Sequence, residues 1–455
     1  MERSVLLAKN SWWKGKEHFQ EDEDYKKWDE KKIKWIPKLL ERIELKPFSL
    51  HFIFGPRQVG KTTIIKLKIR ELLEKTKPEQ IFYFRCDELR DYKELNELLE
   101  SYFKMKEEFE VKSSYIFLDE ITFAEDWFKT IKGWIDDGKF KNDVLVISGS
   151  ASFEVKKHAE YFPGRRGNGR DFLVFPLSFR EFVKIMKPEI YEKIPKIDSL
   201  DEKEIKTKAL KSFVYLKELN YLLDTYLKIG GFPLAINSYS EEKRINDFVK
   251  ETYLSWIKND IVKLDRSINT AREILKSVLT KIPSPLSWES VAKETSIKSP
   301  KTINAYLNMF QELFLINISY YLNLNSLTIE FGKNKKIHLN DPLFYQLFEE
   351  WCLINIKDKE NKNVEDLMAS HLARFGKSSK DYSDEVFYWK NGMEIDSLIK
   401  TRDKVIGFEV KWSNKVNEIK TKIGKMKEVY LISKETFDID RKIIPLSVFL
   451  AVLNV

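Results

Sequence analysis

Short apolar runs alternate with longer amphipathic segments from residue 49 onward. The apolar runs have the length and the aromatic and β-branched content of strands, whereas the segments between them carry apolar residues at helical spacing. The predicted strands are Leu50–Phe54, Ile81–Arg85, Tyr115–Leu118, Val144–Ser148 and Phe172–Phe175, and the predicted helices include Thr62–Lys75 and Tyr92–Phe109. Apolar strands separated by helices predict an α/β fold in which a buried parallel sheet has helices on both faces.

The segment before this sheet, residues 1–48, is polar and rich in aromatic residues. We predict an amphipathic helix over Lys31–Ile43 within it. The apolar face of that helix would be formed by Ile33, Ile36, Leu39, Leu40 and Ile43. Trp12 and Trp13 either fold over a ligand or fill the core.

Beyond the sheet, residues 183–265 have a helical pattern, and residues 266–345 have the pattern of a winged helix. The predicted elements of the latter are helices at Arg272–Lys281, Trp288–Glu294 and Lys301–Phe314, then wing strands at Leu315–Tyr321 and Lys336–Leu339. Ser299 and Pro300 supply an N-cap and a first-turn proline for the third helix. With Lys298, Lys301, Thr302 and Asn304, its start has the composition of a groove-reading helix. The alternative is a module that packs domains together and contacts no DNA.

The last part of the chain, residues 346–455, returns to a mixed α/β pattern. We predict a helix at Asn363–Phe375 and strands at Val386–Lys390, Glu394–Lys400 and Lys404–Lys411. A turn at Asn391-Gly392 would join the first two of these strands.

A glycine-framed loop follows the first predicted strand. It reads Gly55-Pro56-Arg57-Gln58-Val59-Gly60-Lys61-Thr62 and matches G-x-x-x-x-G-K-[ST] in full. Glycines let successive backbone N–H groups turn inward around phosphates, and the next helix adds its positive N-terminal end. Lys61 would bind the β- and γ-phosphates, and the Thr62 hydroxyl would bind Mg²⁺. The predicted nucleotide-binding set is this loop with Thr63.

A second motif ends the third strand, where four apolar residues precede Asp119 and Glu120. Asp119 would hold Mg²⁺ through water, and Glu120 would polarise the attacking water; alternatively Glu120 is a plain loop carboxylate. Both must lie at the carboxyl end of a strand beside the phosphate loop. The fourth strand ends in Ser148-Gly149-Ser150, where Ser148 or Ser150 would contact the γ-phosphate, unless this is an ordinary turn.

Adjacent arginines lie in a glycine-rich loop, Pro163-Gly164-Arg165-Arg166-Gly167. Arg165 would neutralise transition-state charge, in cis or from a neighbouring subunit. The alternatives are nucleic-acid binding and simple solvation of the loop.

The C-terminal strands carry a further set of charged residues. Glu409 and Lys411 are two apart on one strand, so their side chains share a face. A hairpin that brings Asp396 beside them makes an acidic pocket with one cation, with Glu365 on the preceding helix. Mg²⁺ would bind the carboxylates, and Lys411 would activate water or neutralise developing charge.

Composition bounds the partners and the compartment. A chain of 455 residues is expected to contain more than one domain. A charged fraction of 33%, mostly Lys and Glu, and two cysteines favour a thermophile's cytoplasm without a disulfide framework or zinc site. We see no apolar run long enough for a membrane span and no signal peptide. The net charge of +8 permits nucleic-acid binding without requiring it.

The ordered motifs resemble those of a known family. GPRQVGKTT, YIFLDEI with Trp127, ISGSAS, GRR, FPLSFREF, and Gly230-Gly231-Phe232-Pro233 occur in sequence. The set resembles archaeal and bacterial AAA-type ATPases of the STAND-related group, and Asn10-Ser11-Trp12-Trp13 looks like their Asn-Pro-Trp-Trp start. The D-x(12)-E-x-K arrangement resembles the PD-(D/E)xK restriction-endonuclease-like fold. That resemblance implies catalytic roles for Asp396, Glu409 and Lys411, and metal ligation by Asp396, Glu409 and Glu365.

We therefore expect a lead-in at 1–48 packed on the ATPase, a P-loop ATPase core at 49–176, a helical lid at 177–265, a winged helix at 266–345 and a restriction-endonuclease-like domain at 346–455. The predicted catalytic residues of the core are Lys61, Glu120 and Arg165, with Thr62 and Asp119 on Mg²⁺. The expected function is Mg²⁺-dependent ATP hydrolysis acting on DNA through an ATP-gated nuclease. The alternative is a regulatory switch whose C-terminal domain recognises a protein partner. Either form could be a homo-oligomer.

Overall fold

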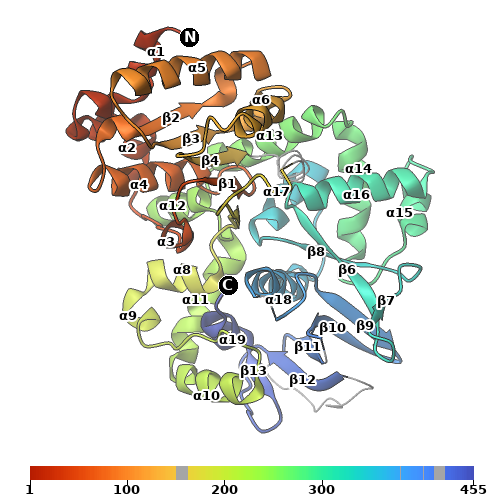
Figure 1. Ribbon diagram of the computed structural model, residues 1–455. Helices are drawn as coiled ribbons and strands as arrows, with labels where there is room; N and C mark the ends of the chain where they lie inside the picture. Colours follow the sequence, from red (N-terminus) through yellow and green to blue (C-terminus); the bar gives the residue numbers. More distant parts are fainter. Residues whose placement is uncertain (150–161, 380, 403, 414–425) are drawn as a thin grey trace. The chain divides into compact units, whose positions relative to one another are not determined.

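The computed structural model describes residues 1–149, 162–379, 381–402, 404–413 and 426–455 (Figure 1). It divides into two compact units, Met1–Phe175 and Pro176–Val455. In the described part of the chain, no helix has both the length and the apolar content needed to cross a membrane.

Unit 1 is built on a five-stranded parallel sheet in the order β2-β3-β4-β1-β5. The strands are β1 (Ser49–Phe54), β2 (Ile81–Arg85), β3 (Tyr115–Asp119), β4 (Val144–Gly149) and β5 (Asp171–Leu173). The predicted parallel α/β sheet is therefore confirmed. Phe54 lies beside Gly149, and Leu118 beside Ile147, so the carboxyl ends of the three central strands meet at one edge.

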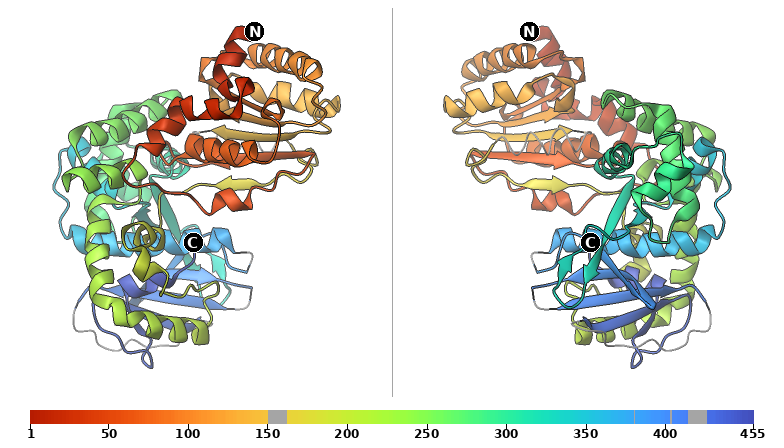
Figure 2. Two further views of the ribbon diagram at one scale, coloured as in Figure 1. Left: turned by 90° about the vertical axis from the view of Figure 1, so that its left-hand side faces the viewer. Right: turned by 90° about the vertical axis from the view of Figure 1, so that its right-hand side faces the viewer.

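Helices cover both faces of this sheet, as Figure 2 shows. Successive residues of β1 point to opposite faces. Phe52 packs in the core under α5 (Tyr92–Glu108) and α6 (Trp127–Asp136), whereas Ile53 packs in the core under α4 (Lys61–Leu73). The near-continuous apolar strands seen in the sequence are explained by this burial on two sides.

The predicted helix over Lys31–Ile43 is wrong. The structure has a single turn there, α3 (Leu39–Arg42), and the preceding residues are not helical. Pro37 has no N–H to donate and disfavours helical geometry at the residue before it. Ile36 is accordingly 51% exposed, while Ile43 is buried.

The N-terminal motif covers the free edge of β2. The Asn10 amide pairs with both backbone groups of Tyr83: Oδ1 accepts from its N–H at 2.7 Å, and Nδ2 donates to its carbonyl at 3.2 Å. The indoles of Trp12 and Trp13 both donate to the Ile81 carbonyl, at 3.1 and 2.9 Å. Since β2 ends the sheet, these side chains satisfy backbone groups that another chain could otherwise pair with. The tryptophans therefore pack on the sheet edge.

Unit 2 combines helices with one mixed sheet, in the order β13-β12-β11-β10-β9-β6-β7, with β8 paired to β6. Its strands are β6 (Ile316–Asn323), β7 (Thr328–Ile329), β8 (Lys336–Leu339), β9 (Phe387–Asn391), β10 (Met393–Lys400), β11 (Val405–Lys411), β12 (Met426–Ser433) and β13 (Ile443–Pro445). Its helices are α8 (Phe179–Met186), α9 (Pro188–Tyr191), α10 (Glu202–Ser212), α11 (Leu216–Ile229), α12 (Pro233–Glu242), α13 (Asp247–Lys263), α14 (Ile268–Lys281), α15 (Trp288–Glu294), α16 (Pro300–Glu312), α17 (Leu343–Cys352), α18 (Lys359–Ser378) and α19 (Leu446–Val452).

The strands expected to form a wing are continuous with the C-terminal sheet. β6 pairs antiparallel with β8, and it also pairs in parallel with β9 through Tyr320 and Tyr321. The helices α14, α15 and α16 occur where the winged helix was predicted, and Ser299 caps α16 by accepting from the Thr302 N–H. Side chains carried by β8 are thereby brought to the C-terminal sheet.

The Gly-Gly-Phe-Pro motif is explained by a close approach. The buried Asp341 carboxylate accepts from the Gly231 N–H at 2.9 Å. A Cβ on Gly230, whose φ is +73°, would come within 1.9 Å of Asp341 Oδ1, and one on Gly231 within 2.1 Å of the Leu177 carbonyl oxygen. Both positions therefore require glycine, and Pro233 then begins α12.

Helix α18 is buried along most of its length and carries a buried histidine. His371 Nε2 accepts from the Phe179 N–H at 3.0 Å, while Nδ1 lies 2.9 Å from the Leu367 carbonyl oxygen to which it donates. Burial, with a smaller contribution from the Arg374 charge, lowers the pKa of His371 to about 3. The ring is therefore neutral in the folded protein.

This histidine predicts a specific loss of stability in acid. Because the folded pKa lies below the unfolded value, the stabilisation is present above about pH 6.5 and is lost as the pH falls towards 3, by up to about 1.4 kcal/mol per pH unit. Urea unfolding of wild type and His371→Gln from pH 7 to 4 measures it. The wild type should lose stability more steeply than the variant, with His18→Gln as a control at a partly exposed site. Parallel pH profiles for wild type and His371→Gln would contradict the assignment.

Candidate functional site

The glycine-framed loop leaves the carboxyl end of β1 and enters α4. Gly55 and Gly60 both have positive φ, at +153° and +96°. A Cβ on Gly55 would come within 2.3 Å of the Val174 backbone oxygen. Gly60 is the N-cap of α4, so the unpaired N–H groups of the first helical turn are at the loop. The loop therefore has the geometry that the phosphate-binding motif predicts.

Lys61 is folded over this loop. Its side chain is almost fully buried, and Nζ donates to the carbonyls of Gly55 and Pro56 at 3.1 and 3.0 Å. A fixed cation is thereby placed within the turn of the loop, the position from which a lysine binds the β- and γ-phosphates.

Thr62 and Asp119 meet beside the loop. Thr62 Oγ1 donates to Asp119 Oδ2 at 2.7 Å, Tyr83 Oη donates to the same oxygen at 3.2 Å, and Ser148 Oγ donates to Oδ1. Burial and the neighbouring Glu120 charge raise the pKa of Asp119, while the Ser148 and Thr62 hydrogen bonds oppose that shift. A hydroxyl and a carboxylate in contact are oxygen ligands of the kind that Mg²⁺ prefers, so these residues fit the predicted metal.

Glu120 follows at the end of β3, with a left-handed φ of +52°. Its N–H donates to Ser148 Oγ at 3.1 Å, so Ser148 joins the backbone of Glu120 to the carboxylate of Asp119. Contact of Ser148 with a γ-phosphate stays a prediction, and Ser150 lies outside the described residues.

Arg165 is placed away from the phosphate loop within the chain. Its guanidinium donates to Asp136 Oδ1 at 2.6 Å, at the end of α6. The arginine loop runs beside the amino end of β1. The Leu50 N–H donates to the Arg166 carbonyl, and Ser49 forms an isolated antiparallel β-bridge with Gly167. The phosphate loop follows the other end of β1, roughly 17 Å away at about 3.3 Å per residue. The structure thus differs from the predicted role in cis, and a role in trans stays a prediction.

Tyr83 is a site residue that the sequence did not reveal. It is one aromatic among several in β2, and no spacing rule relates it to Asp119. Its hydroxyl reaches Asp119 because β2 and β3 are neighbours and Arg85 lies beside Asp119 in the register.

The C-terminal residues predicted from the second motif also come together. Asp396 on β10 and Glu409 on β11 belong to an antiparallel hairpin in which Ser397 faces Phe408. Asp396 Oδ2 accepts from the Val410 N–H at 2.9 Å, and Lys411 is ion-paired with Glu409.

A buried lysine lies among these carboxylates. Lys336, on β8, is 1% exposed. Its ammonium contacts Glu394 Oε1 at 2.8 Å and Asp396 Oδ1 at 2.9 Å, and it is also ion-paired with Glu365 of α18. Neither Lys336 nor Glu394 is predicted as a site residue from the sequence. Alternation along β10 could have found Glu394, because it shares a face with Asp396, but no local signal relates Lys336 to that strand.

The charged residues of this cluster shift one another's pKa values. Burial raises the pKa of Glu409 to about 7, with a further contribution from Asp396. Burial together with the Asp396 charge also raises the pKa of Glu365 well above its usual range. Burial alone would raise the pKa of Asp396, but Lys336 and the Val410 N–H reverse that and hold it below its ordinary value. Asp396 is therefore an ionised partner of Lys336, as is Glu394, whose pKa Lys336 also lowers.

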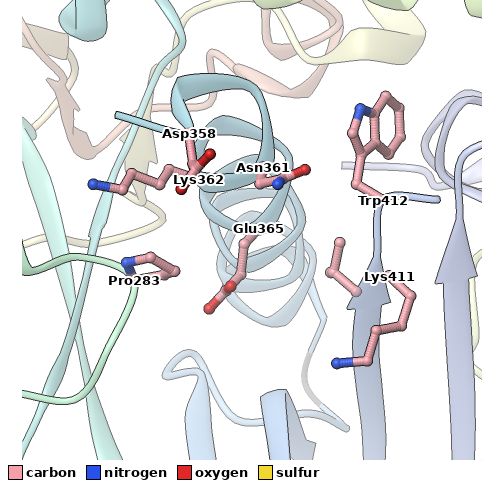
Figure 3. Close-up of a pocket in the computed structure, with 8 residues that line it drawn as sticks. Pro283, Asp358, Asn361, Lys362, Glu365, Lys411 and Trp412 are labelled. Atoms are coloured by element: carbon pink, nitrogen blue, oxygen red, sulfur yellow. The ribbon is translucent and has the colours of Figure 1, made fainter. Parts of the chain in front are cut away.

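A pocket of about 370 Å³ adjoins the cluster, within unit 2. It is lined by Pro283, Asp358, Asn361, Lys362, Glu365, Val410, Lys411 and Trp412. Figure 3 shows Glu365 and Lys411 facing the same space from α18 and β11. The predicted Mg²⁺ ligands Glu365, Asp396 and Glu409 are near one another, but the donor set does not fit a metal, because an ammonium already contacts two of them. Among the described residues, no three or more His, Cys, Asp or Glu side chains form a metal-holding group.

Three family models match separate parts of the chain. Residues 48–183 match an AAA domain, residues 220–348 a domain of unknown function (DUF8612), and residues 360–447 a second domain of unknown function (DUF4143). Unit 1 contains an AAA-type P-loop domain. This match covers the glycine loop, Asp119 and Glu120.

Relatives of longer extent are distant. The chain is 24% identical to the uncharacterized protein MJ1637 of Methanocaldococcus jannaschii, over 79% of this chain and 74% of that protein. Among solved structures it is similar to the Walker-type ATPase PABY2304 of Pyrococcus abyssi, with 15% identity, a TM-score of 0.41, and coverage of 74% and 97%. It is also similar to the Aeropyrum pernix ORC1 protein in complex with DNA, with 14% identity, a TM-score of 0.31, and coverage of 68% and 88%. Similarity at this level carries no information on what this chain binds.

The placement of Arg165 generates a testable prediction. Arg165→Ala should leave the affinity of the chain for ATP unchanged, because the guanidinium is paired with Asp136 at the far end of β1. Equilibrium titration with a fluorescent ATP analogue measures this, with Lys61→Ala as the variant that should lose binding. Weakened binding in a monomeric Arg165→Ala protein would contradict the placement. Recovery of ATP turnover on mixing Arg165→Ala with Glu120→Gln protein would reveal a role in trans.

Proposed function

We propose that unit 1 binds ATP with Mg²⁺ and hydrolyses it. The observation that carries this proposal is the contact between Thr62 and Asp119 beside a loop that also holds Lys61. These three side chains come from two elements far apart in the sequence, and their convergence beside the loop is what binding of a nucleotide with Mg²⁺ requires. The AAA-domain match over the same residues supports it.

Each residue then has a role in hydrolysis. The loop N–H groups and Lys61 bind the β- and γ-phosphates, and Thr62 and Asp119 would hold the metal, directly and through water. Bound Mg²⁺ would neutralise phosphate charge. Glu120 orients the attacking water and accepts its proton, and Ser148 keeps the Asp119–Glu120 turn in place.

Two substitutions separate binding from turnover. Lys61→Ala should abolish nucleotide binding, because the phosphates lose a charge-assisted contact from a fixed cation. Glu120→Gln should bind ATP normally and lower turnover by about 10²- to 10⁴-fold. Calorimetric titration and phosphate release measure the two effects, with Lys75→Ala as an exposed-lysine control near the end of the same helix. A Lys61→Ala protein that binds and hydrolyses ATP normally would refute the proposal.

The role of unit 2 has two candidates. An ATP-gated nuclease is favoured by Glu365 and Lys411, which line one pocket, and by Glu409, which is ion-paired with Lys411; the start of α16 would then be the DNA reader. A regulatory switch, in which this domain recognises a partner, is favoured by Lys336, which compensates the carboxylates without a metal. We give the switch precedence on that contact.

Cleavage assays decide between these candidates. The switch predicts that plasmid and single-stranded DNA remain intact with Mg²⁺ or Mn²⁺, with and without ATP, in wild type and Lys411→Ala alike. ATP-sensitive cutting by the wild type that is lost in Lys411→Ala would establish the nuclease instead. Glu120→Gln beside Lys411→Ala then shows whether ATP turnover is what gates it.

A further inference from the structure

We propose that the Lys336 ammonium is the resident cation of the C-terminal carboxylate cluster and takes the place of a divalent metal there. The proposal rests on the restriction-endonuclease-like interpretation of residues 346–455, and it is independent of ATP hydrolysis by unit 1.

The oxygens that a metal would need are largely in use. Both oxygens of Asp396 have partners, Lys336 and the Val410 N–H. Both oxygens of Glu394 also have partners, Lys336 and Lys390, the latter at 2.7 Å. An ammonium has three N–H donors and no acceptor. Lys336 has three carboxylate partners, so its donors match its acceptors in number.

The strand that carries Lys336 is fixed in position. Lys336 lies opposite Ser319 in the β6–β8 ladder. Two residues further along β8, His338 is paired with Asp366 of α18 at 2.9 Å, and the Leu339 N–H donates to the same carboxylate at 2.9 Å. Consecutive acidic residues of α18, Glu365 and Asp366, are therefore both used to hold β8. The backbone that carries Lys336 is thereby held beside the cluster.

The positive charge of Lys336 also disfavours a divalent ion in the cluster. Lys336 neutralises charge on Glu394 and Asp396 and also contacts Glu365, while Lys411 is ion-paired with Glu409. A divalent ion on the same oxygens would lie beside a buried, fixed cation and would be repelled by it. Two buried carboxylate oxygens of the cluster, Glu365 Oε1 and Glu409 Oε2, accept no hydrogen bond from the described residues, and the first of them is ion-paired with Lys336, so they do not make a cage for a metal. The cluster then binds β8 to the sheet and to α18 as a structural connection.

Binding of Mn²⁺ to the nucleotide-free full-length chain tests this, because electron paramagnetic resonance counts free and bound ion directly. Lys336→Met should bind one more Mn²⁺ per chain than wild type, and the added ion should be lost in Lys336→Met/Asp396→Asn. Lys335→Met, the same change at the adjacent lysine, which bonds to the Phe331 carbonyl instead, should bind as wild type does. A folded Lys336→Met protein that gains no ion would overturn the proposal.

The wild-type background provides a second arm that does not depend on folding of the lysine variant. Asp396→Asn alone should leave Mn²⁺ uptake unchanged, since no ion is held there. A fall of one equivalent in Asp396→Asn would show that the wild-type cluster holds a metal and would overturn the proposal. Both Mn²⁺ measurements are made without nucleotide, so their outcome does not depend on whether unit 1 binds ATP. Failure of the ATP-binding test with Lys61→Ala would therefore leave them unaffected.

Discussion

Unit 1 depends on the hydrogen bonds that converge on the buried carboxylate of Asp119. Hydroxyl groups from β2, β4 and the start of α4 all donate to it, through Tyr83, Ser148 and Thr62. Hydrogen bonds to a charged group contribute about 1.5–3 kcal/mol each. They also fix where the carboxyl ends of the strands lie relative to the phosphate loop. The parallel register thus brings residues of four elements to this carboxylate, which is where the proposed nucleotide site lies.

Unit 2 uses buried charge in a different way. Lys336 and His338 are two residues apart on β8, so their side chains point to the same face. There Lys336 contacts Glu365 and His338 contacts Asp366, both on α18. A buried ion pair seldom adds net stability, but removing one partner leaves an uncompensated charge. Such contacts specify which strand lies against which helix. The chain can therefore resemble a nuclease motif without having a fitting metal site among the described residues. The same carboxylates can instead hold strand β8 against helix α18.

Local patterns in the sequence predicted much of this structure. The five strands of unit 1, the glycine loop and the Asp119–Glu120 pair follow from apolar runs and from one motif. The prediction of a helix over Lys31–Ile43 was wrong because it followed the apolar periodicity and gave too little weight to Pro37, which disfavours a helix there. The roles of Tyr83 and Lys336 were beyond reach, since each depends on pairing between strands distant in the sequence. The placement of Arg165 likewise depends on the loop returning to the amino end of β1.

The dependence of ATP affinity on Mg²⁺ tests the central claim most directly. Titration of wild type and Thr62→Val with ATP, in EDTA and in Mg²⁺, isolates the contribution of the metal. The account predicts that Mg²⁺ tightens binding to the wild type and that this gain largely disappears in Thr62→Val, while affinity in EDTA is preserved. An equal gain from Mg²⁺ in both proteins would contradict it, because Thr62 and Asp119 would then not form the metal site.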